Sequence, residues 1–320
     1  MGYQRITESY MNQSVISNLI TNRNMLIELQ KKISSGKEID RASQDVFSAT
    51  TILGANSALG RIDTYLNNIN LARSELETAD QAVLTTLDSI HKVRELTIQG
   101  LNATSGPNEL NIIAKQIEQL LEQTKDMGNT KFGTKFIFGG QNTSAAPFTD
   151  GINPGEIQYN GSTDGTAERT VEITEGISLV INMGGDEIFG YYYTGDHDNN
   201  AATPDTTEGQ GLLATLIILK EEMEKADPDK DIIRDQLTAL NDDLATLLQS
   251  QSTLGGMLTR LDITEKIHGD DQINLTDAKS KAQDVDMAKA ISDLKFQETA
   301  LQASLQVSAR IIQPSIMNYL

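Results

Sequence analysis

Residues 59–101 read LGRIDTYLNNINLARSELETADQAVLTTLDSIHKVRELTIQGL and carry the longest regular pattern in the chain. Apolar side chains recur along this segment at alternating spacings of three and four residues. Such a heptad pattern predicts a single α-helix that packs almost parallel to its neighbours, in a bundle or coiled coil. At 1.5 Å per residue, this helix would be about 65 Å long.

Further heptad runs flank this segment on both sides. The N-terminal run consists of Val15, Leu19, Asn22, Leu26, Leu29 and Ile33. Two more extend from Leu110 to Met127 and from Ile233 to Leu261, and Asp227-Pro228 is expected to cap the start of the second. The last run is looser and comprises Ala282, Val285, Ala288, Ile291, Leu294, Leu301, Leu305, Ile312 and Ile316.

Polar residues interrupt the heptad stripes at Asn22, Arg73, Asp80, Arg94 and Gln251. One interpretation is that each stripe drifts around its helix, so that these side chains lie at its edge and reach solvent. The other is that they are buried between helices and fix the register or the oligomeric state. The sequence leaves both interpretations open.

The period of the pattern changes from 3.5 to 2 between Gly140 and Gly209. EIQYNG, RTVEIT and SLVINM alternate in the manner of short strands and predict a small antiparallel sheet. DEIF, before the tyrosines at 191–193, is also strand-like. The helical pattern resumes at Gly211. The expected fold is therefore mainly α with an inserted small β domain, on a long antiparallel helical bundle or coiled coil built from both ends of the chain.

Charge divides the chain in a similar way. Residues 1–40 carry five basic and four acidic side chains, residues 281–320 carry four of each, and residues 141–210 carry one basic against twelve acidic. Near-neutral ends can pack against copies of themselves, whereas the acidic middle belongs in water. We expect terminal helices at 1–42 and 275–320 as an inner assembly layer, a helical rod at 43–139 and 210–274, and a solvent-facing β domain at 140–209.

Composition excludes several classes of function. The 320 residues have a formal charge of −19, so neither nucleic acid nor an anionic membrane is an expected partner. There is no cysteine, which excludes disulfides and thiolate sites. The longest apolar run, Leu212–Leu219, is far shorter than the roughly 20 residues that span a bilayer. The first residues lack an apolar segment, so no cleavable signal peptide is expected.

The segment Lys135–Phe148, KFIFGGQNTSAAPF, suggests either a phosphate-binding loop or a hinge. A phosphate loop needs a lysine after its glycines, and none follows Gly139 and Gly140 closely. The three histidines share no ligand spacing, and the Asp196–Asn200 loop lacks the glycine and glutamate of a calcium loop. We therefore expect no catalytic, cofactor-binding or metal-binding residues. The segment is interpreted as a hinge to the β domain, formed by Phe136, Phe138, Gly139, Gly140, Pro147 and Phe148.

The C-terminal residues ALQASLQVSARIIQPSIMNYL are apolar on one side and almost uncharged. Such a helix is marginal alone, so it needs a partner: its own N-terminal helix or other copies of the chain. The expected assembly interface consists of Val15, Leu19, Leu26, Leu29, Ile33, Leu294, Leu301, Leu305, Ile312 and Ile316.

Several stretches resemble the flagellin superfamily, and within it the branch of hook–filament junction subunits. They are KKISSGKEIDRASQDVFSAT (31–50), VRELTIQGLNAT (93–104), DVDMAKAI (284–291), KFIFGGQNTSAAPF, YNG (159–161), GGDEIF (184–189) and the C-terminal tail. Filament subunits usually end in a tail containing Gln-Ala-Asn, which this chain lacks. Where the superfamily often has an acidic pair, the chain has Gln44-Asp45.

The resemblance implies an extracellular structural subunit, not an enzyme, that links hook to filament in the bacterial flagellum. Its implied partners are copies of itself in a ring, the adjoining hook-associated junction protein, flagellin, and an export chaperone with the secretion apparatus. No cofactor is implied. The alternatives are a flagellin and, from another class, a coiled-coil signalling module, which would need membrane spans or a sensor. A hydrolase on the β domain lacks any catalytic grouping.

Overall fold

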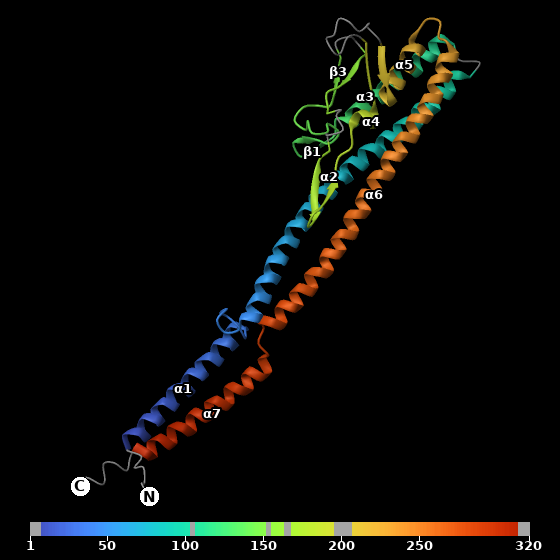
Figure 1. Cartoon of the computed structure of the whole chain (residues 1–320). Helices are drawn as coiled ribbons and strands as arrows, with labels where there is room; N and C mark the ends of the chain where they lie inside the picture. Colours follow the sequence, from blue (N-terminus) through green and yellow to red (C-terminus); the bar gives the residue numbers. More distant parts are fainter. Residues whose placement is uncertain (1–7, 103–105, 152–154, 163–167, 195–206, 313–320) are drawn as a thin grey trace, which may run out of the picture. The chain divides into compact units, whose positions relative to one another are not determined.

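The computed structural model describes residues 8–102, 106–151, 155–162, 168–194 and 207–312. It confirms the predicted fold class, with long helices from both ends of the chain and small sheets between them (Figure 1). The chain forms two compact units, residues 1–61 with 270–320, and residues 62–269. Helices α2 (Val46–Leu101) and α6 (Lys230–Gln283) contribute to both units. The three-part division expected from the sequence stays a prediction.

The larger unit has a heptad core on α2 and α6. Every seventh residue of α6 is buried, and the series is Ile233, Leu240, Leu247, Leu254, Leu261 and His268. The corresponding series on α2 is Ile62, Ile69, Leu76, Val83, Ile90 and Thr97. Two shorter helices complete the helical part, α3 (Pro107–Gly128) and the apolar α5 (Gly211–Glu224), which pack on each other. The 3.5-residue period therefore corresponds to a packed core in this unit.

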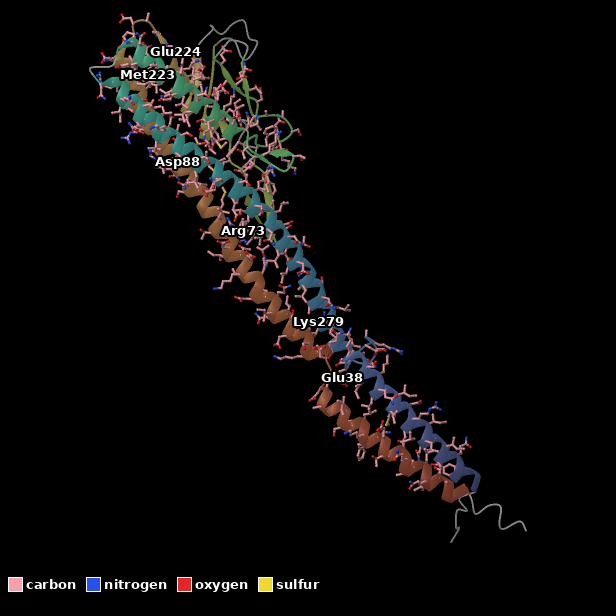
Figure 2. All side chains as sticks on the ribbon, turned by 180° about the vertical axis from the view of Figure 1, so that it is seen from behind. Glu38, Arg73, Asp88, Met223, Glu224 and Lys279 are labelled. Carbon is pink, nitrogen blue, oxygen red and sulfur yellow. The ribbon has the colours of Figure 1, made fainter. Side chains whose placement is uncertain are left out.

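The polar interruptions of α2 lie at the edge of this core. Arg73, labelled in Figure 2, is half-buried and donates to Asp262 Oδ1 at 2.7 Å and to Glu265 Oε2 at 2.5 Å. The hydrogen bond to Glu265 raises the pKa of Arg73. Asp80 is half-buried, and burial raises its pKa, whereas Arg94 is exposed. For these three residues, the structure agrees with the interpretation that the stripe drifts.

Side-chain hydrogen bonds stabilise the start of α2 and the loop before α6. Asp45 Oδ1 accepts from the backbone N–H of Phe47 at 2.9 Å, and the hydrogen bonds from Ser48 lower the pKa of Asp45. The single acid of the Gln44-Asp45 pair is thus the N-cap of α2. The expected cap of α6 at Asp227-Pro228 is wrong. The buried Glu222 accepts from the backbone N–H of Asp229 at 2.8 Å and holds the loop, and α6 begins at Lys230.

The β segments form three separate sheets rather than one. A four-stranded antiparallel sheet has the order β3-β4-β7-β8, and the remaining strands make two hairpins, β1-β2 and β5-β6. The strands are β1 (Lys131–Phe132), β2 (Lys135–Phe136), β3 (Phe148–Asp150), β4 (Ile157–Tyr159), β5 (Thr170–Thr174), β6 (Ile177–Val180), β7 (Tyr191–Thr194) and β8 (Thr207–Gln210).

Two predictions in this region are therefore wrong. RTVEIT and SLVINM pair with each other but not with EIQYNG, because the hairpin that they form docks on the long helices instead of extending the sheet. DEIF belongs to a short helix, α4 (Gly185–Phe189), whose Ile188 and Phe189 are both buried. Such a short apolar run is compatible with either a strand or a helical turn.

Hairpin β5-β6 is fixed to both α2 and α6. Arg169 forms two hydrogen bonds with the buried Glu75 of α2, at 2.5 and 3.1 Å. Asn68 Nδ2 donates to the carbonyl oxygen of Glu172 at 3.0 Å. His268 of α6 approaches the carbonyl oxygen of Ile173 at 2.7 Å. The hairpin thus connects α2 with α6 at one end of the larger unit.

His268 takes a core position of α6 where the preceding members of the series are leucine or isoleucine. Its ring lies 5.5 Å from the ring of Tyr65 and is stacked on it. A leucine there would leave the carbonyl oxygen of Ile173 without this partner. The seven-residue spacing from Leu261 is the sequence signal that could have identified this histidine as a core residue.

Candidate assembly interface

The predicted hinge residues lie in a packed aromatic cluster. All six are buried, and Phe138 and Phe148 are only 1% and 2% exposed. Both rings meet Phe189 edge to face, with centroids 5.0 and 5.6 Å away. The hydroxyl of Tyr159 donates to the carbonyl oxygen of Phe138 at 2.8 Å, and burial raises the pKa of Tyr159 to about 12. The segment packs its own aromatic side chains and leaves its glycines inside the fold; its role as a hinge stays a prediction.

Gly139 and Gly140 are required by the turn for different reasons. Gly140 has a φ of +63°, a conformation that other residues adopt at a cost. A Cβ atom on Gly139 would lie 2.3 Å from the backbone oxygen of Asn142. This oxygen belongs to the backbone of the same tight turn and cannot move aside as a flexible side chain would.

Replacing Gly139 with alanine should therefore destabilise the chain, by about 1–3 kcal/mol. Thermal unfolding followed by circular dichroism measures the effect. Gly256→Ala is the matched control, because Gly256 lies in α6 with open space around its Cα. In that helix, alanine should stabilise by roughly 0.4–1 kcal/mol. Equal melting temperatures for the two variants would contradict the role given to the Gly139 turn.

The described residues offer little for ligand chemistry. Within them, no three His, Asp or Glu side chains converge on a possible metal position. Nor is any helix in these ranges long and apolar enough to cross a lipid bilayer. His91 is exposed, and the Asp196–Asn200 loop lies outside the described residues. In the stretch GGQNTS, the two glycines are buried in the turn described above, while Gln141, Asn142 and Ser144 are exposed.

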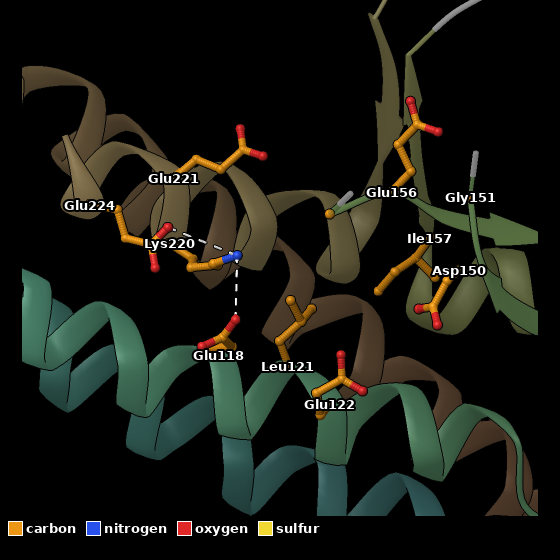
Figure 3. A pocket seen from close by; sticks show the side chains of 11 residues that line it. Glu118, Leu121, Glu122, Asp150, Gly151, Glu156, Ile157, Lys220, Glu221 and Glu224 are labelled. Carbon is orange, nitrogen blue, oxygen red and sulfur yellow. Dashed lines mark ion pairs between the residues drawn. The ribbon is translucent and has the colours of Figure 1, made fainter. Parts of the chain in front are cut away.

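A hollow of about 660 Å³ lies between α3, α5 and the four-stranded sheet (Figure 3). Leu121 and Ile157 contribute its apolar part, and most other lining side chains are carboxylates. Lys220 projects between Glu118 and Glu224, with nitrogen–oxygen distances of 3.6 and 4.0 Å. The hollow is thus an acidic surface of the larger unit.

The terminal helices α1 (Glu8–Ser35) and α7 (Met287–Ile312) lie side by side and antiparallel (Figure 1). The six positions of the N-terminal heptad run, from Val15 to Ile33, are all half-buried. The facing residues of α7 are Ala290, Leu294, Gln297, Leu301, Ser304 and Ser308, again spaced by four and three. We call this contact the α1–α7 seam.

Asn22 makes polar contacts across the α1–α7 seam. Its Nδ2 donates to Ser304 Oγ at 3.2 Å, and Gln297 Nε2 donates to the carbonyl oxygen of Asn22 at 3.2 Å. Sliding the helices by one heptad would separate these groups. For Asn22, unlike Arg73, the structure agrees with the interpretation that a polar residue fixes the register.

The outward faces of both helices are rich in apolar side chains. Large exposed residues are Ile16, Ile20, Met25 and Ile27 on α1, and Ile291, Phe296, Leu305 and Val307 on α7. On α7 the residues that face α1 are mostly small or polar, apart from Leu294 and Leu301, while several large apolar ones face outward. These outward residues lie on two sides of the helix, since Phe296 and Leu305 are nine residues, or about two and a half turns, apart. Exposed apolar side chains in this number are typical of a surface that another protein covers.

The predicted interface residues are therefore distributed over two surfaces. Those of α1, together with Leu294 and Leu301, lie in the α1–α7 seam. Leu305 lies outside it and is 53% exposed. Ile312 is the last residue of α7, its side chain is not described, and Ile316 lies outside the described residues. The outward residues Ile16, Ile20 and Phe296 were missed, because a search for one heptad stripe passes over a second apolar face.

In the smaller unit, backbone hydrogen bonds join the segment that connects α1 to α2 with the segment that connects α6 to α7. The N–H of Glu38 donates to the oxygen of Gln283 at 2.8 Å, and that of Val285 donates to the oxygen of Gly36 at 3.0 Å. Gly36 permits this approach with a φ of +71°. These contacts explain the Ser-Ser-Gly turn after α1, because the turn brings the α1–α2 connection against the α6–α7 connection.

Comparison with known proteins places these features in one family. Residues 6–143 match the bacterial flagellin N-terminal helical region, and residues 237–320 match the C-terminal helical region. The chain is 23% identical over 310 residues to flagellar hook-associated protein 3 of Escherichia coli, covering 94% of each chain. It is also 23% identical over 318 residues to flagellin of Bacillus subtilis, covering 97% of this chain and 96% of the flagellin.

Solved structures show the same fold. A putative flagellar hook-associated protein from Vibrio parahaemolyticus aligns with a TM-score of 0.62 and 18% identity, over 75% of this chain and 100% of that one. The flagellar junction protein of Legionella pneumophila aligns with a TM-score of 0.59 and 16% identity, over 73% and 100%. The two matched flagellin regions together take in well over half of the sequence and include both terminal helices, and the chain therefore belongs to the bacterial flagellin family.

Proposed function

We propose that the chain is a structural junction subunit of the bacterial flagellum, which links hook to filament. The observation that carries the proposal is the inverted arrangement of α7, where Ile291, Phe296, Leu305 and Val307 are exposed while most residues facing α1 are small or polar. Burying each of them would contribute about 1.5–3 kcal/mol, which favours assembly through paired terminal helices. The hook-associated relatives, which match the chain over nearly its whole length, favour a junction subunit over a filament subunit.

The proposal includes the following organisation. Copies of the chain form a ring, with residues 1–42 and 275–320 as the inner layer, the helical rod around it, and the acidic β domain toward solvent. The ring contacts the adjoining hook-associated junction protein on one side and flagellin on the other. Export proceeds through the flagellar secretion apparatus with a chaperone. No catalysis is required of the subunit.

A deletion strain tests this function against the flagellin alternative. Cells without a junction subunit should build hooks, carry no filaments and release flagellin into the medium. Cells without the filament subunit should build bare hooks and release none. Electron microscopy and immunoblotting of the medium separate these outcomes. Bare hooks without released flagellin would make the chain a filament subunit instead.

The free chain should be cleaved by protease first within residues 1–40 and 281–320. The α1–α7 seam is only half-buried and includes Asn22 and Gln297, so it offsets little of the entropy of ordering two long helices. The same residues should be protected after assembly, once neighbouring copies cover the outward faces. Limited proteolysis with mass spectrometry measures both states. Ends that survive in the free chain as long as the α2–α6 core would contradict the coupling of order to assembly.

A further inference from the structure

The first four turns of α2 carry an unusual surface. Residues 46–60, VFSATTILGANSALG, contain no charged side chain, although the whole chain has a formal charge of −19. Val46, Phe47 and Leu53 are nevertheless 70%, 80% and 66% exposed. We call these three residues and the adjoining cavity the α2 platform.

The cavity of the α2 platform has a volume of about 180 Å³. Its apolar lining comes from Ile39, Ala42, Ala49, Ile52 and Leu53. This volume is comparable with that of an apolar cavity of roughly 150 Å³ that accommodates a benzene ring. Arg41 and Gln283 also line this cavity, and Gln283 lies in the hydrogen-bonded connection between α6 and α7. The oxygen of Gln283 accepts a backbone hydrogen bond from Glu38 at 2.8 Å, and the size of this open hollow suits one aromatic side chain.

Arg41 adds a charge preference to the α2 platform. The neighbouring Asp40 is taken by an ion pair with Lys31, whose hydrogen bond lowers the pKa of Asp40. Asp40 also lines the cavity and attracts Arg41 electrostatically, but the guanidinium of Arg41 forms no ion pair among the described residues. An occupant that presents an aromatic ring with a carboxylate next to it would give Arg41 such a partner.

The outward face of α7 presents this combination. Phe296 is 75% exposed, and Asp293, one helical turn before it, is exposed as well. Residues three apart on a helix lie on the same face. Ala303 and Val307 continue this face toward the C-terminus, and both are exposed and uncharged. An uncharged α2 surface would meet it without electrostatic repulsion.

The chain cannot cover its own α2 platform in this way. Phe296 is fixed in α7 and exposed, so it does not occupy the cavity of its own copy. A face of α7 that fills this cavity would therefore come from a second copy.

We propose that the α2 platform of one copy receives the outward face of α7 from a second copy, with Phe296 in the cavity and Asp293 paired with Arg41. This inference rests on the proposed self-assembly and names the contact. The two surfaces differ, so the contact is head to tail and repeats from copy to copy. Contacts of this type generate rings or open helical assemblies, as a junction requires.

Disulfide trapping tests the contact without background, because the chain has no cysteine. Leu53→Cys and Phe296→Cys are placed in separate copies and expressed together in cells that lack the native subunit. After mild oxidation of isolated flagella, a dimer should appear on non-reducing gels only when both variants are present. Leu248→Cys with Phe296→Cys is the control, since Leu248 is exposed but belongs to the larger unit and not to the platform.

Charge exchange provides an independent measurement. Arg41→Glu should reduce filament attachment several-fold, and Arg41→Glu combined with Asp293→Arg should restore it. Flagella that assemble but give no more Leu53–Phe296 dimer than the control pair would overturn this contact and leave the proposed function intact. A native chain that joins no flagellum at all would instead contradict the proposed function. An exchanged pair that assembles no better than Arg41→Glu alone would exclude the ion pair.

Discussion

Leu305→Asp should leave the melting temperature of the free chain unchanged and remove filaments from hooks. Leu305 lies on α7 outside the α1–α7 seam and is 53% exposed, so the variant loses little packing within its own copy. In an assembly, the same position would place an unpaired carboxylate in an apolar layer. The cost should be several kcal/mol per subunit, and a ring repeats it at every copy.

Three measurements on the Leu305 variant distinguish the possible outcomes. Immunoblotting of secreted protein checks export, thermal unfolding checks the free chain, and electron microscopy checks attachment. Gln306→Asp is a suitable control, because it adds the same charge at an exposed residue that is already polar. A large fall in the melting temperature would assign Leu305 to its own bundle. Motile cells with normal filaments would show that this face of α7 is not an assembly surface.

Arg169→Met should destabilise the larger unit by about 3–5 kcal/mol, the cost of leaving a buried charge without its partner. The partner is Glu75, which is 5% exposed and receives both guanidinium hydrogen bonds. The melting temperature should fall on the order of 10 °C for a unit of this size. Chemical and thermal unfolding of the purified chain provide the measurement.

The double variant Arg169→Met, Glu75→Leu separates a charge effect from a packing effect. Replacing both partners with apolar side chains removes the unpaired carboxylate, so most of the lost stability should return. Glu95→Leu is the matched control, because Glu95 is an exposed residue of the same helix. If the single variant is as stable as the native chain, hairpin β5-β6 does not brace α2. If the double variant is no more stable than the single one, the ion pair is not the cause.

The contacts of hairpin β5-β6 with α2 and α6 change which parts of the acidic β segment are expected to tolerate replacement. On composition, residues 140–209 should tolerate replacement better than the helices, since they offer surface rather than assembly contacts. The structure adds that hairpin β5-β6 covers Glu75 and His268, two buried polar groups of the helical core. Tolerance is therefore expected for loops of the four-stranded sheet, while removal of the hairpin should destabilise α2 and α6.

The sequence predicts the long helices well because their signal is repeated many times. The series from Ile233 to Leu261 is identified by its spacing; every seventh residue from Ile233 is buried, and Leu237, Leu244 and Leu258 are partly buried. The position of the core on α2 is less well defined, since Arg73 and Asp80 lie at its edge while Ala72 and Ala79 lie inside it. Alanines carry little weight in a search for large apolar residues, so the drift of the stripe is hard to detect.

The strand pairing and the division of the α7 residues between two surfaces could not be predicted from the sequence. Alternation with a period of 2 identifies strands but not their partners, so the separate pairing of β5 and β6 could not be derived. The pairing depends on Arg169, Glu172 and Ile173 finding partners on helices about a hundred residues away. Likewise, the sequence indicates which residues of α7 are apolar, but only the structure separates Leu301 in the seam from Leu305 outside it.

The inverted arrangement of α7 also affects how an assembly would grow. A partial ring of such subunits would have two open edges, and each would leave apolar side chains in contact with water. Adding a subunit covers one edge and creates another, whereas the last subunit covers both at once. Growth would then be cooperative, with small oligomers rare and the closed ring strongly favoured. Free subunits would remain separate at low concentration and convert to complete rings over a narrow range of concentration.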